Sequence, residues 1–302
     1  MPSLARILAH VLPTLAVVLI TYWMGSALTA FSKQGDTVVA THIAGFAWAK
    51  GDGRVFNWHP VLMAVGFLFF ASQAALVYIV LPFSHDTNKS GFEMLIRRCE
   101  QRIHAGLHLT GFTSSVVGLV AVFRFHNEHA ITNLYSLHSW LGLLVAIIFA
   151  THSRGARLDP PYHPTNCCPL QFLGSFVVFL YPGARQPVRT SILPYHIGFG
   201  LSILALAFLT AATGVLEKLS FNASCNVSGV LDGKNVAGYM APDCVLGNTI
   251  GLVLAASLVA IVVALWEAKH PAAASTVPGT LTDEAVPLLS GNGAKAQADA
   301  TV

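Results

Sequence analysis

The sequence predicts an all-α polytopic membrane protein that crosses the bilayer with six transmembrane helices. Three observations support this prediction: the composition, six apolar stretches, and histidines at the start of four of these stretches. Hydrophobic residues make up 54% of the 302 residues and charged residues only 10%. Because a soluble domain carries about 25% charged residues, we expect the lipid bilayer to be the solvent for this chain.

Charge and cysteine content exclude several classes of function. Lys and Arg outnumber Asp and Glu by only 17 to 14, so the chain lacks the basic field that binds phosphate backbones, and we expect no nucleic-acid partner. The five cysteines form no Cys-x-x-Cys pair. This pattern indicates neither a zinc ribbon nor a covalently attached haem, so any haem would be held by axial ligands alone.

Six stretches are apolar enough to span the membrane, which takes about 20 residues. They run over residues 7–31, 59–83, 104–125, 138–181 with a polar interruption, 196–216 and 245–266. The first could also be a cleaved signal peptide, but its apolar core is long for one and we favour a retained span. We expect one membrane domain over residues 1–270, with a central four-helix bundle, and a disordered cytoplasmic tail over residues 271–302.

Loop composition predicts that both termini are cytoplasmic. This orientation places the larger share of Lys and Arg on the cytoplasmic side, as the positive-inside rule expects. Two glycosylation sequons, at Asn222 and Asn226, then lie in a lumenal loop. Cys225 and Cys244 share that loop, where an oxidising lumen allows them to form a disulfide.

Four of the thirteen histidines stand at the beginning of a predicted span. His59 and His138 begin the second and fourth spans, whereas His104 and His196 begin the third and fifth. Because successive spans run in opposite directions, we expect His59 to meet His138 near the lumenal face. By the same argument, His104 meets His196 near the cytoplasmic face.

Two facing imidazoles in a helical bundle are suitable axial ligands for one haem iron. The sequence therefore predicts two haem b groups per chain, about 20 Å apart. A single such histidine is more often an interfacial side chain, but four at matching positions inside a membrane point to function. His108 lies one turn after His104 on the same helical face, and spacing alone does not decide which of the two is the ligand.

At these residues the sequence resembles the cytochrome b561 family, and most closely its animal secretory-vesicle and lysosomal branch. The resemblance covers about residues 44–265, with motifs such as Phe56-Asn-Trp-His-Pro-Val-Leu-Met63, Leu134-Tyr-Ser-Leu-His-Ser-Trp140 and Pro194-Tyr-His196. It implies six helices with haem between the central four. The implied activity is electron transfer from cytosolic ascorbate to lumenal monodehydroascorbate or ferric iron, in an endosomal, lysosomal or secretory-vesicle membrane.

The resemblance also implies roles for individual residues. The haem ligands of the family fall on His59, His104, His138 and His196, which selects His104 over His108. The family residues that contact the lumenal haem correspond to Asn133, Leu134, Tyr135, Ser136 and Glu217. A family arginine implicated in ascorbate binding matches Arg189. The arginines expected to add positive charge to the same cytoplasmic site are Arg97, Arg98 and Arg102.

The sequence departs from the family pattern at three places. Ile79 replaces a family arginine and Gln101 replaces a family lysine, which weakens the expected ascorbate site. A polar insertion over about residues 151–171 divides the fourth span into two pieces that are each too short to cross the bilayer. We expect the insertion to loop out of the membrane, and we interpret it as a retained intron or a variant exon.

Two other functions are alternatives to electron transfer. A six-span transporter could bind a transition metal with these histidines, but it predicts carboxylates beside them, and the middle of the spans supplies almost none. A haem-bearing subunit without a substrate of its own is the second alternative. The sequence leaves the oligomeric state open, with a homodimer as one option, and it indicates no catalytic side chain besides the iron ligands.

Overall fold

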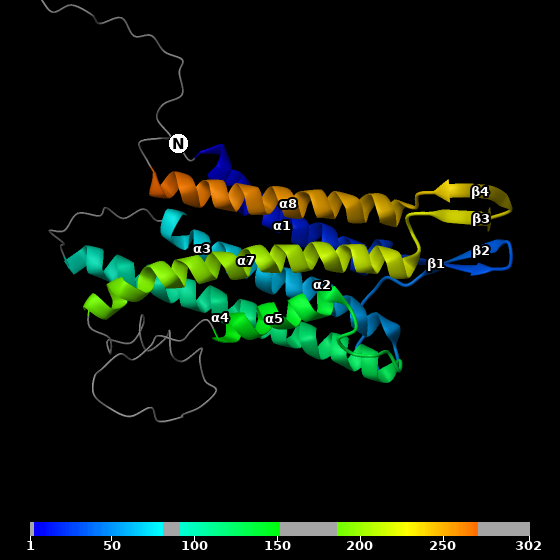
Figure 1. Cartoon of the computed structure of the whole chain (residues 1–302), viewed down its shortest axis with the longest axis horizontal. Coiled ribbons are helices and arrows are strands. Elements are labelled where there is room, and N and C mark those ends of the chain that lie inside the picture. The colour runs from blue at the N-terminus through cyan, green and yellow to red at the C-terminus, as the bar shows by residue number, and fades with distance from the viewer. Residues whose placement is uncertain (1–2, 81–90, 152–185, 271–302) are drawn as a thin grey trace, which may run out of the picture.

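The computed structural model describes residues 3–80, 91–151 and 186–270, without the side chains of residues 80, 91–98, 151, 186–190 and 192. Long helices run side by side along the molecule (Figure 1). The first is α1 (Leu4–Tyr22), which continues into the π-helical turn η1 (Trp23–Ala27). The second span consists of η2 (Gly53–Asn57), α2 (Trp58–Met63), the π-helical η3 (Ala64–Phe70) and α3 (Ala71–Val80). The later helices are α4 (Gly91–Glu128), α5 (Leu137–Thr151), α7 (Gln186–Asn222) and α8 (Pro242–Lys269).

Five helical segments of the described chain are long and apolar enough to span a membrane. They are Leu4–Ala27, Gly53–Ile79, Cys99–Glu128, Leu193–Asn222 and Pro242–Lys269. These segments agree with the predicted polytopic helical fold. The sixth apolar helix is shorter, over Leu137–Ala150, and the insertion beyond Thr151 lies outside the described residues. The count of six spans therefore stays a prediction, as does the tail over residues 271–302.

The helices extend beyond the predicted spans. Helix α4 begins at Gly91 and α7 at Gln186, well before the predicted starts at His104 and His196. Hydropathy marks only the part of a helix that suits lipid, whereas the backbone hydrogen bonds of a helix continue into water. The first span is shorter than predicted, because a strand begins at Thr29.

A four-stranded sheet lies beyond one end of the helices (Figure 1). Strands β1 (Thr29–Gln34) and β2 (Thr37–His42) form one antiparallel hairpin, and β3 (Val227–Leu231) and β4 (Lys234–Tyr239) form another. Strands β2 and β3 join the hairpins in parallel. This sheet was not predicted from the sequence. We call this end of the molecule the sheet end, and the opposite end, where α1 begins and α8 finishes, the terminal end.

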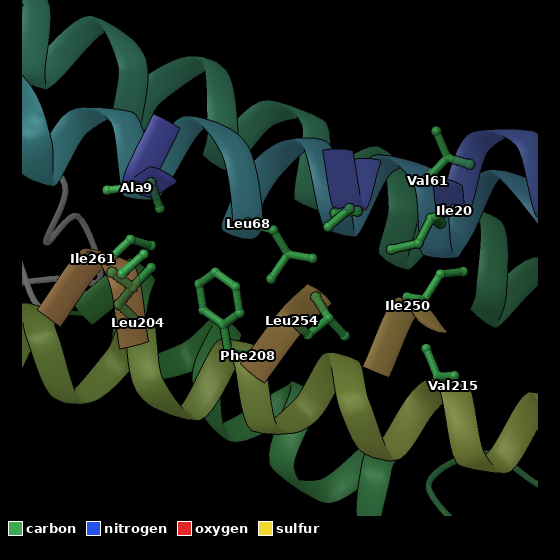
Figure 2. Packing of buried hydrophobic residues seen from close by; sticks show 14 of the residues in the cluster. Ala9, Ile20, Val61, Leu68, Leu204, Phe208, Val215, Ile250, Leu254 and Ile261 are labelled. Atoms are coloured by element: carbon green, nitrogen blue, oxygen red, sulfur yellow. The ribbon is translucent and has the colours of Figure 1, made fainter. Parts of the chain in front are cut away.

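The hydrophobic core includes the first helix. Helix α1 packs along α8, and both contact the helices around η3 and α7. Buried residues from all four elements meet there, among them Ala9, Leu68, Phe208, Leu254 and Ile261 (Figure 2). In contrast, many apolar residues point outward, such as Leu252 with 74% of its surface exposed, which is the arrangement expected of a helix in lipid. The retention of the first span, predicted over residues 7–31, stays a prediction.

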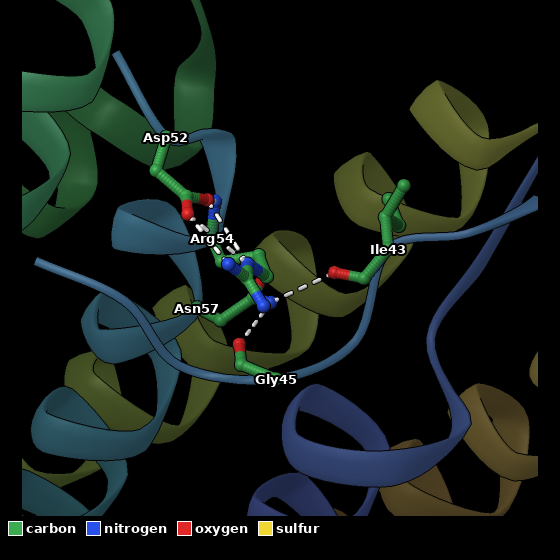
Figure 3. A network of polar contacts seen from close by, with 5 residues as sticks. All are labelled: Ile43, Gly45, Asp52, Arg54 and Asn57. Atoms are coloured by element: carbon green, nitrogen blue, oxygen red, sulfur yellow. Dashed lines mark hydrogen bonds and ion pairs between the residues drawn. The ribbon is translucent and has the colours of Figure 1, made fainter. Parts of the chain in front are cut away.

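A buried asparagine holds the segment that precedes His59 (Figure 3). Asn57 is only 2% exposed. Its side-chain nitrogen donates hydrogen bonds to the backbone oxygens of Gly45, at 2.8 Å, and Ile43, at 3.1 Å. These bonds tie the loop after β2 to the start of α2, and they thereby fix the direction in which His59 enters the bundle.

Replacing Asn57 by alanine is expected to destabilise the fold, because two partly buried carbonyl oxygens lose their donor. The cost of such unsatisfied groups is about 1–3 kcal/mol, which should lower the Tm of the purified protein by several degrees. Arg54→Ala is the matched control in the same loop. Arg54 is exposed and pairs with Asp52, whose pKa it lowers to about 2 through hydrogen bonds. Because surface ion pairs contribute little stability, this variant should keep the parental Tm. Equal Tm values for the two variants would contradict the role of Asn57.

Candidate functional site

The four histidines named from the sequence lie in two facing pairs. The ring centroids of His59 and His138 are 6.2 Å apart, and those of His104 and His196 are also 6.2 Å apart. The first pair joins α2 and α5 at the sheet end, whereas the second joins α4 and α7 toward the terminal end. The structure therefore brings together the same histidines that helix direction predicted to meet.

The spacing within each pair suits a metal ion between the rings. An imidazole nitrogen binds a metal at about 2 Å, so two imidazoles on opposite sides of one ion have ring centroids about 6 Å apart. The observed separation of 6.2 Å in both pairs matches this geometry. The residues present thus fit haem iron held by two axial histidines.

Three of the four rings are oriented by a backbone carbonyl of a neighbouring helix. The Nδ1 atoms lie 3.1 Å from the Gly118 oxygen for His59, 2.8 Å from the Ala74 oxygen for His104 and 2.9 Å from the Thr210 oxygen for His138. Because a carbonyl can only accept, each Nδ1 carries the proton. Each Nε2 then keeps its lone pair, which is the tautomer required of a metal ligand.

Glycines make room for the sheet-end pair. A Cβ atom at Gly214 of α7 would lie 2.7 Å from Cε1 of His138, which is closer than real Cβ atoms come. A Cβ atom at Gly118 of α4 would lie 3.2 Å from the sulfur of Met63, one turn after His59. The histidines can approach each other because these two positions carry no side chain.

A cavity opens beside His59 and His138, and all five residues expected to contact the lumenal haem line it: Asn133, Leu134, Tyr135, Ser136 and Glu217. The carboxylate of Glu217 accepts hydrogen bonds from the Tyr135 hydroxyl, at 2.8 Å, and from the Ser136 hydroxyl, at 3.0 Å. Partial burial and the bond to Glu217 raise the pKa of Tyr135. The hydroxyl therefore keeps its proton and fastens the loop before α5 to α7.

The cavity is also lined by Phe56, His126 and Lys218, to which the sequence alone gave no role there. His126 lies in the last turn of α4, and its ring is 6.2 Å from that of Tyr135. The Lys218 nitrogen lies 4.4 Å from the ring centroid of Phe56. Polar side chains near the end of a span, such as those of His126 and Lys218, commonly extend toward water. Their positions in the sequence therefore did not indicate that they line a cavity.

Aromatic rings connect the two histidine pairs. Phe67 of η3 lines the sheet-end cavity, and its ring lies 5.2 Å from that of Phe149. Phe149 in turn lies 5.5 Å from the ring of His108, which lies 4.5 Å from His104. Side chains therefore fill the middle of the bundle between the two pairs.

The residues expected to bind ascorbate lie on the two helices of the second pair. Arg102 is exposed on α4, with Arg97 and Arg98 earlier in the same helix, and Arg189 is in the first turn of α7. The side chains of Arg97, Arg98 and Arg189 lie outside the described part of the structure. Ile79, where the family pattern has an arginine, is buried in the hydrophobic core. The ascorbate site therefore stays a prediction.

Comparison with known proteins settles the family. The model of eukaryotic cytochrome b561 matches residues 58–156 and 165–222, which include all four paired histidines. This chain belongs to the cytochrome b561 family. The break between the two matched ranges falls within the insertion predicted at residues 151–171. Membership of the family implies that the chain binds haem b.

Relatives of this cytochrome b561 cover most of its length. The lysosomal membrane ascorbate-dependent ferrireductase of Mus musculus is 39% identical over 250 residues, which are 81% of this chain and 85% of that protein. The protein of the same name from Danio rerio is 34% identical over 231 residues, or 75% and 80% of the two chains. The plasma membrane ascorbate-dependent reductase of Xenopus tropicalis is 36% identical over 210 residues, or 70% and 61%.

Proposed function

We propose that this protein carries single electrons from cytosolic ascorbate, through two haem b groups, to monodehydroascorbate or ferric iron in the lumen. The observation that carries the proposal is a pair of histidines, facing at 6.2 Å, toward each end of the bundle. The protein is an ascorbate-dependent transmembrane oxidoreductase, like its relatives from mouse and frog. The number of haem groups, the direction of transfer and the acceptor are the parts that need a test.

The side chains of the bundle would bind haem, orient the haem ligands or fill the space between the two histidine pairs. His59 and His138 would hold one haem and His104 and His196 the other. Backbone carbonyls keep the rings of His59, His104 and His138 in the binding tautomer. Haem supplies the one-electron chemistry of its iron, which no side chain of this bundle offers. Phe67, Phe149 and His108 fill the space between the pairs and exclude water from it.

The disulfide supports an orientation with the sheet end in the lumen. Cys225 and Cys244 form a disulfide, as predicted from the sequence, and such bonds persist in oxidising compartments. The terminal end, with the arginines of α4 and α7, then faces the cytosol. The names of the mouse and zebrafish relatives favour the lysosomal membrane as the location.

An absorption spectrum with ascorbate as the only reductant tests the proposal. In sealed vesicles that expose only the terminal end, external ascorbate should produce the spectrum of reduced haem b. A ferric chelate enclosed in the vesicles should then reoxidise it, which separates an oxidoreductase from a haem-bearing subunit without a substrate. A protein purified without haem, or haem that ascorbate leaves oxidised, would refute the proposal.

Arg189→Ala should slow reduction by ascorbate, most visibly at low salt. Ascorbate is an anion near neutral pH, and a cation beside the cytosolic pair raises its local concentration and orients it. Because Ile79 and Gln101 replace two cations of the family pattern, the remaining arginines should contribute a larger share of the attraction for ascorbate. Stopped-flow reduction at subsaturating ascorbate measures the effect.

Two comparisons make the Arg189 experiment specific. Lys269→Ala removes an exposed cation at the same end but outside the four histidine-bearing helices, so it should leave the rate unchanged. A small neutral reductant should reduce the Arg189→Ala protein at the parental rate. If ascorbate reduces this variant as fast as the parent, the donor binds elsewhere.

A further inference from the structure

Lys218 places a cation in the wall of the sheet-end cavity. It lies on α7 one position after Glu217, is only partly exposed, and lines the same cavity as His59 and His138. Among the described residues, no carboxylate lies within ion-pair distance of its nitrogen. A cation that is withdrawn from water without a counter-ion is unfavourable, and ionisable groups inside membrane proteins tend to mark function.

The nearby carboxylates are occupied by other partners. Both oxygens of Glu217 accept hydrogen bonds from Tyr135 and Ser136. One oxygen of Asp243, at the start of α8, accepts from the Trp23 indole and from the backbone nitrogen of Thr29. Asp243 attracts the charge of Lys218 from a longer distance, but neither acid is bonded to the ammonium group. Its hydrogen-bond donors are therefore available to a ligand.

The Lys218 ammonium group lies over the ring of Phe56, which is a neighbour of His59. Its nitrogen lies 4.4 Å from the ring centroid of Phe56, a cation–π contact that favours the charged form. The Phe56 ring in turn lies 6.0 Å from that of His59. A single aromatic ring therefore separates a positive charge from a residue expected to bind iron.

We propose that Lys218 binds a carboxylate oxygen of the molecule that enters the cavity of His59 and His138, and that its charge favours electron acceptance there. The inference rests on the proposed function, because it takes haem to be held by that pair. The carboxylate could belong to a haem propionate or to an anionic ferric chelate arriving from the lumen. A nearby positive charge stabilises the state with one more electron, so it raises the reduction potential.

Redox titration of the intact haem-loaded protein, without ascorbate or acceptor, tests the inference. Lys218→Met and Lys218→Gln should both lower the midpoint potential of the haem held by His59 and His138, and leave the other haem unshifted. Lys218→Arg should retain the parental potential, because it keeps the charge. Lys234→Met, at an exposed lysine of β4, is the matched control and should have no effect.

Kinetics with ferric citrate then identify the source of the carboxylate. A lowered potential in the neutral variants assigns it to haem. An unshifted potential together with a raised KM for ferric citrate assigns it to the acceptor. That result supports anion binding by Lys218 and refutes its effect on the potential of the haem. If the neutral variants have normal haem content, unchanged potential and unchanged KM, the role of Lys218 is refuted and the proposed function is not. A parent protein without haem would instead refute the proposed function.

Discussion

Replacing His104 or His196 by alanine is expected to remove one haem and leave the other in place. The two histidine pairs lie on different segments of the helices, and their Nδ1 atoms bond to different carbonyls, that of Ala74 for His104 and that of Thr210 for His138. Loss of one axial ligand should therefore halve the haem content without disturbing the sheet-end pair. A haemochrome assay of the purified variants measures the ratio of haem to chain.

Two further histidines make this experiment specific. His108→Ala should keep both haem groups if His104 is the ligand, although the two rings are only 4.5 Å apart. His270→Ala, at an exposed position after α8, should behave as the parent. Loss of all haem from the His104→Ala protein, or loss of none, would contradict the assignment of two independent pairs.

Gly111→Ala is expected to lower both stability and haem content. The helix that carries His59 crosses α4 at Gly66 and Gly111, where a Cβ atom on Gly111 would lie 2.7 Å from the backbone oxygen of Gly66 and 3.1 Å from Cβ of Phe70. Backbone cannot move aside as a flexible side chain can, so the helices must separate. Overpacking of this kind costs about 1–3 kcal/mol, and both histidine pairs depend on the position of α4.

Gly251→Ala provides the control for the crossing. Gly251 lies in α8 with no atom near its missing side chain, and alanine favours a helix over glycine by about 1 kcal/mol. This variant should retain its haem and be as stable as the parent or slightly more so. Thermal loss of haem absorbance is measured for the Gly111→Ala and Gly251→Ala proteins. Similar midpoint temperatures would show that the helix crossing tolerates a methyl group.

The pairing of the histidines could be predicted because it depends only on helix direction. Once residues 59, 104, 138 and 196 are placed at the beginnings of successive spans, alternation of direction decides which rings share an end. The resemblance to the family added Glu217 and the residues before His138, and these do line one cavity. Lys218 could not be predicted in this way, because a lysine at the end of a span is usually solvated.

The sheet could not be predicted from hydropathy, because neither hairpin contains an apolar stretch long enough to mark a membrane span. A local signal was nevertheless present in the second hairpin. Asp232 and Gly233 both have positive φ, of 50° and 77°, and an Asp-Gly pair between two short strand-like runs predicts a tight hairpin turn. The early starts of α4 and α7 were missed for a related reason, since hydropathy marks where a helix enters lipid and not where it begins. In α7 the helix also continues through Pro194, a residue that usually ends one.

The number of haem b groups per chain in the intact protein tests the central claim most directly. The measurement combines haem quantified by its absorbance in alkaline pyridine with chain quantified by amino-acid analysis. Two facing histidine pairs predict two haem groups per chain, both low-spin because each iron has two strong axial ligands. One haem per chain, or a high-spin signal from half of the iron, would contradict it.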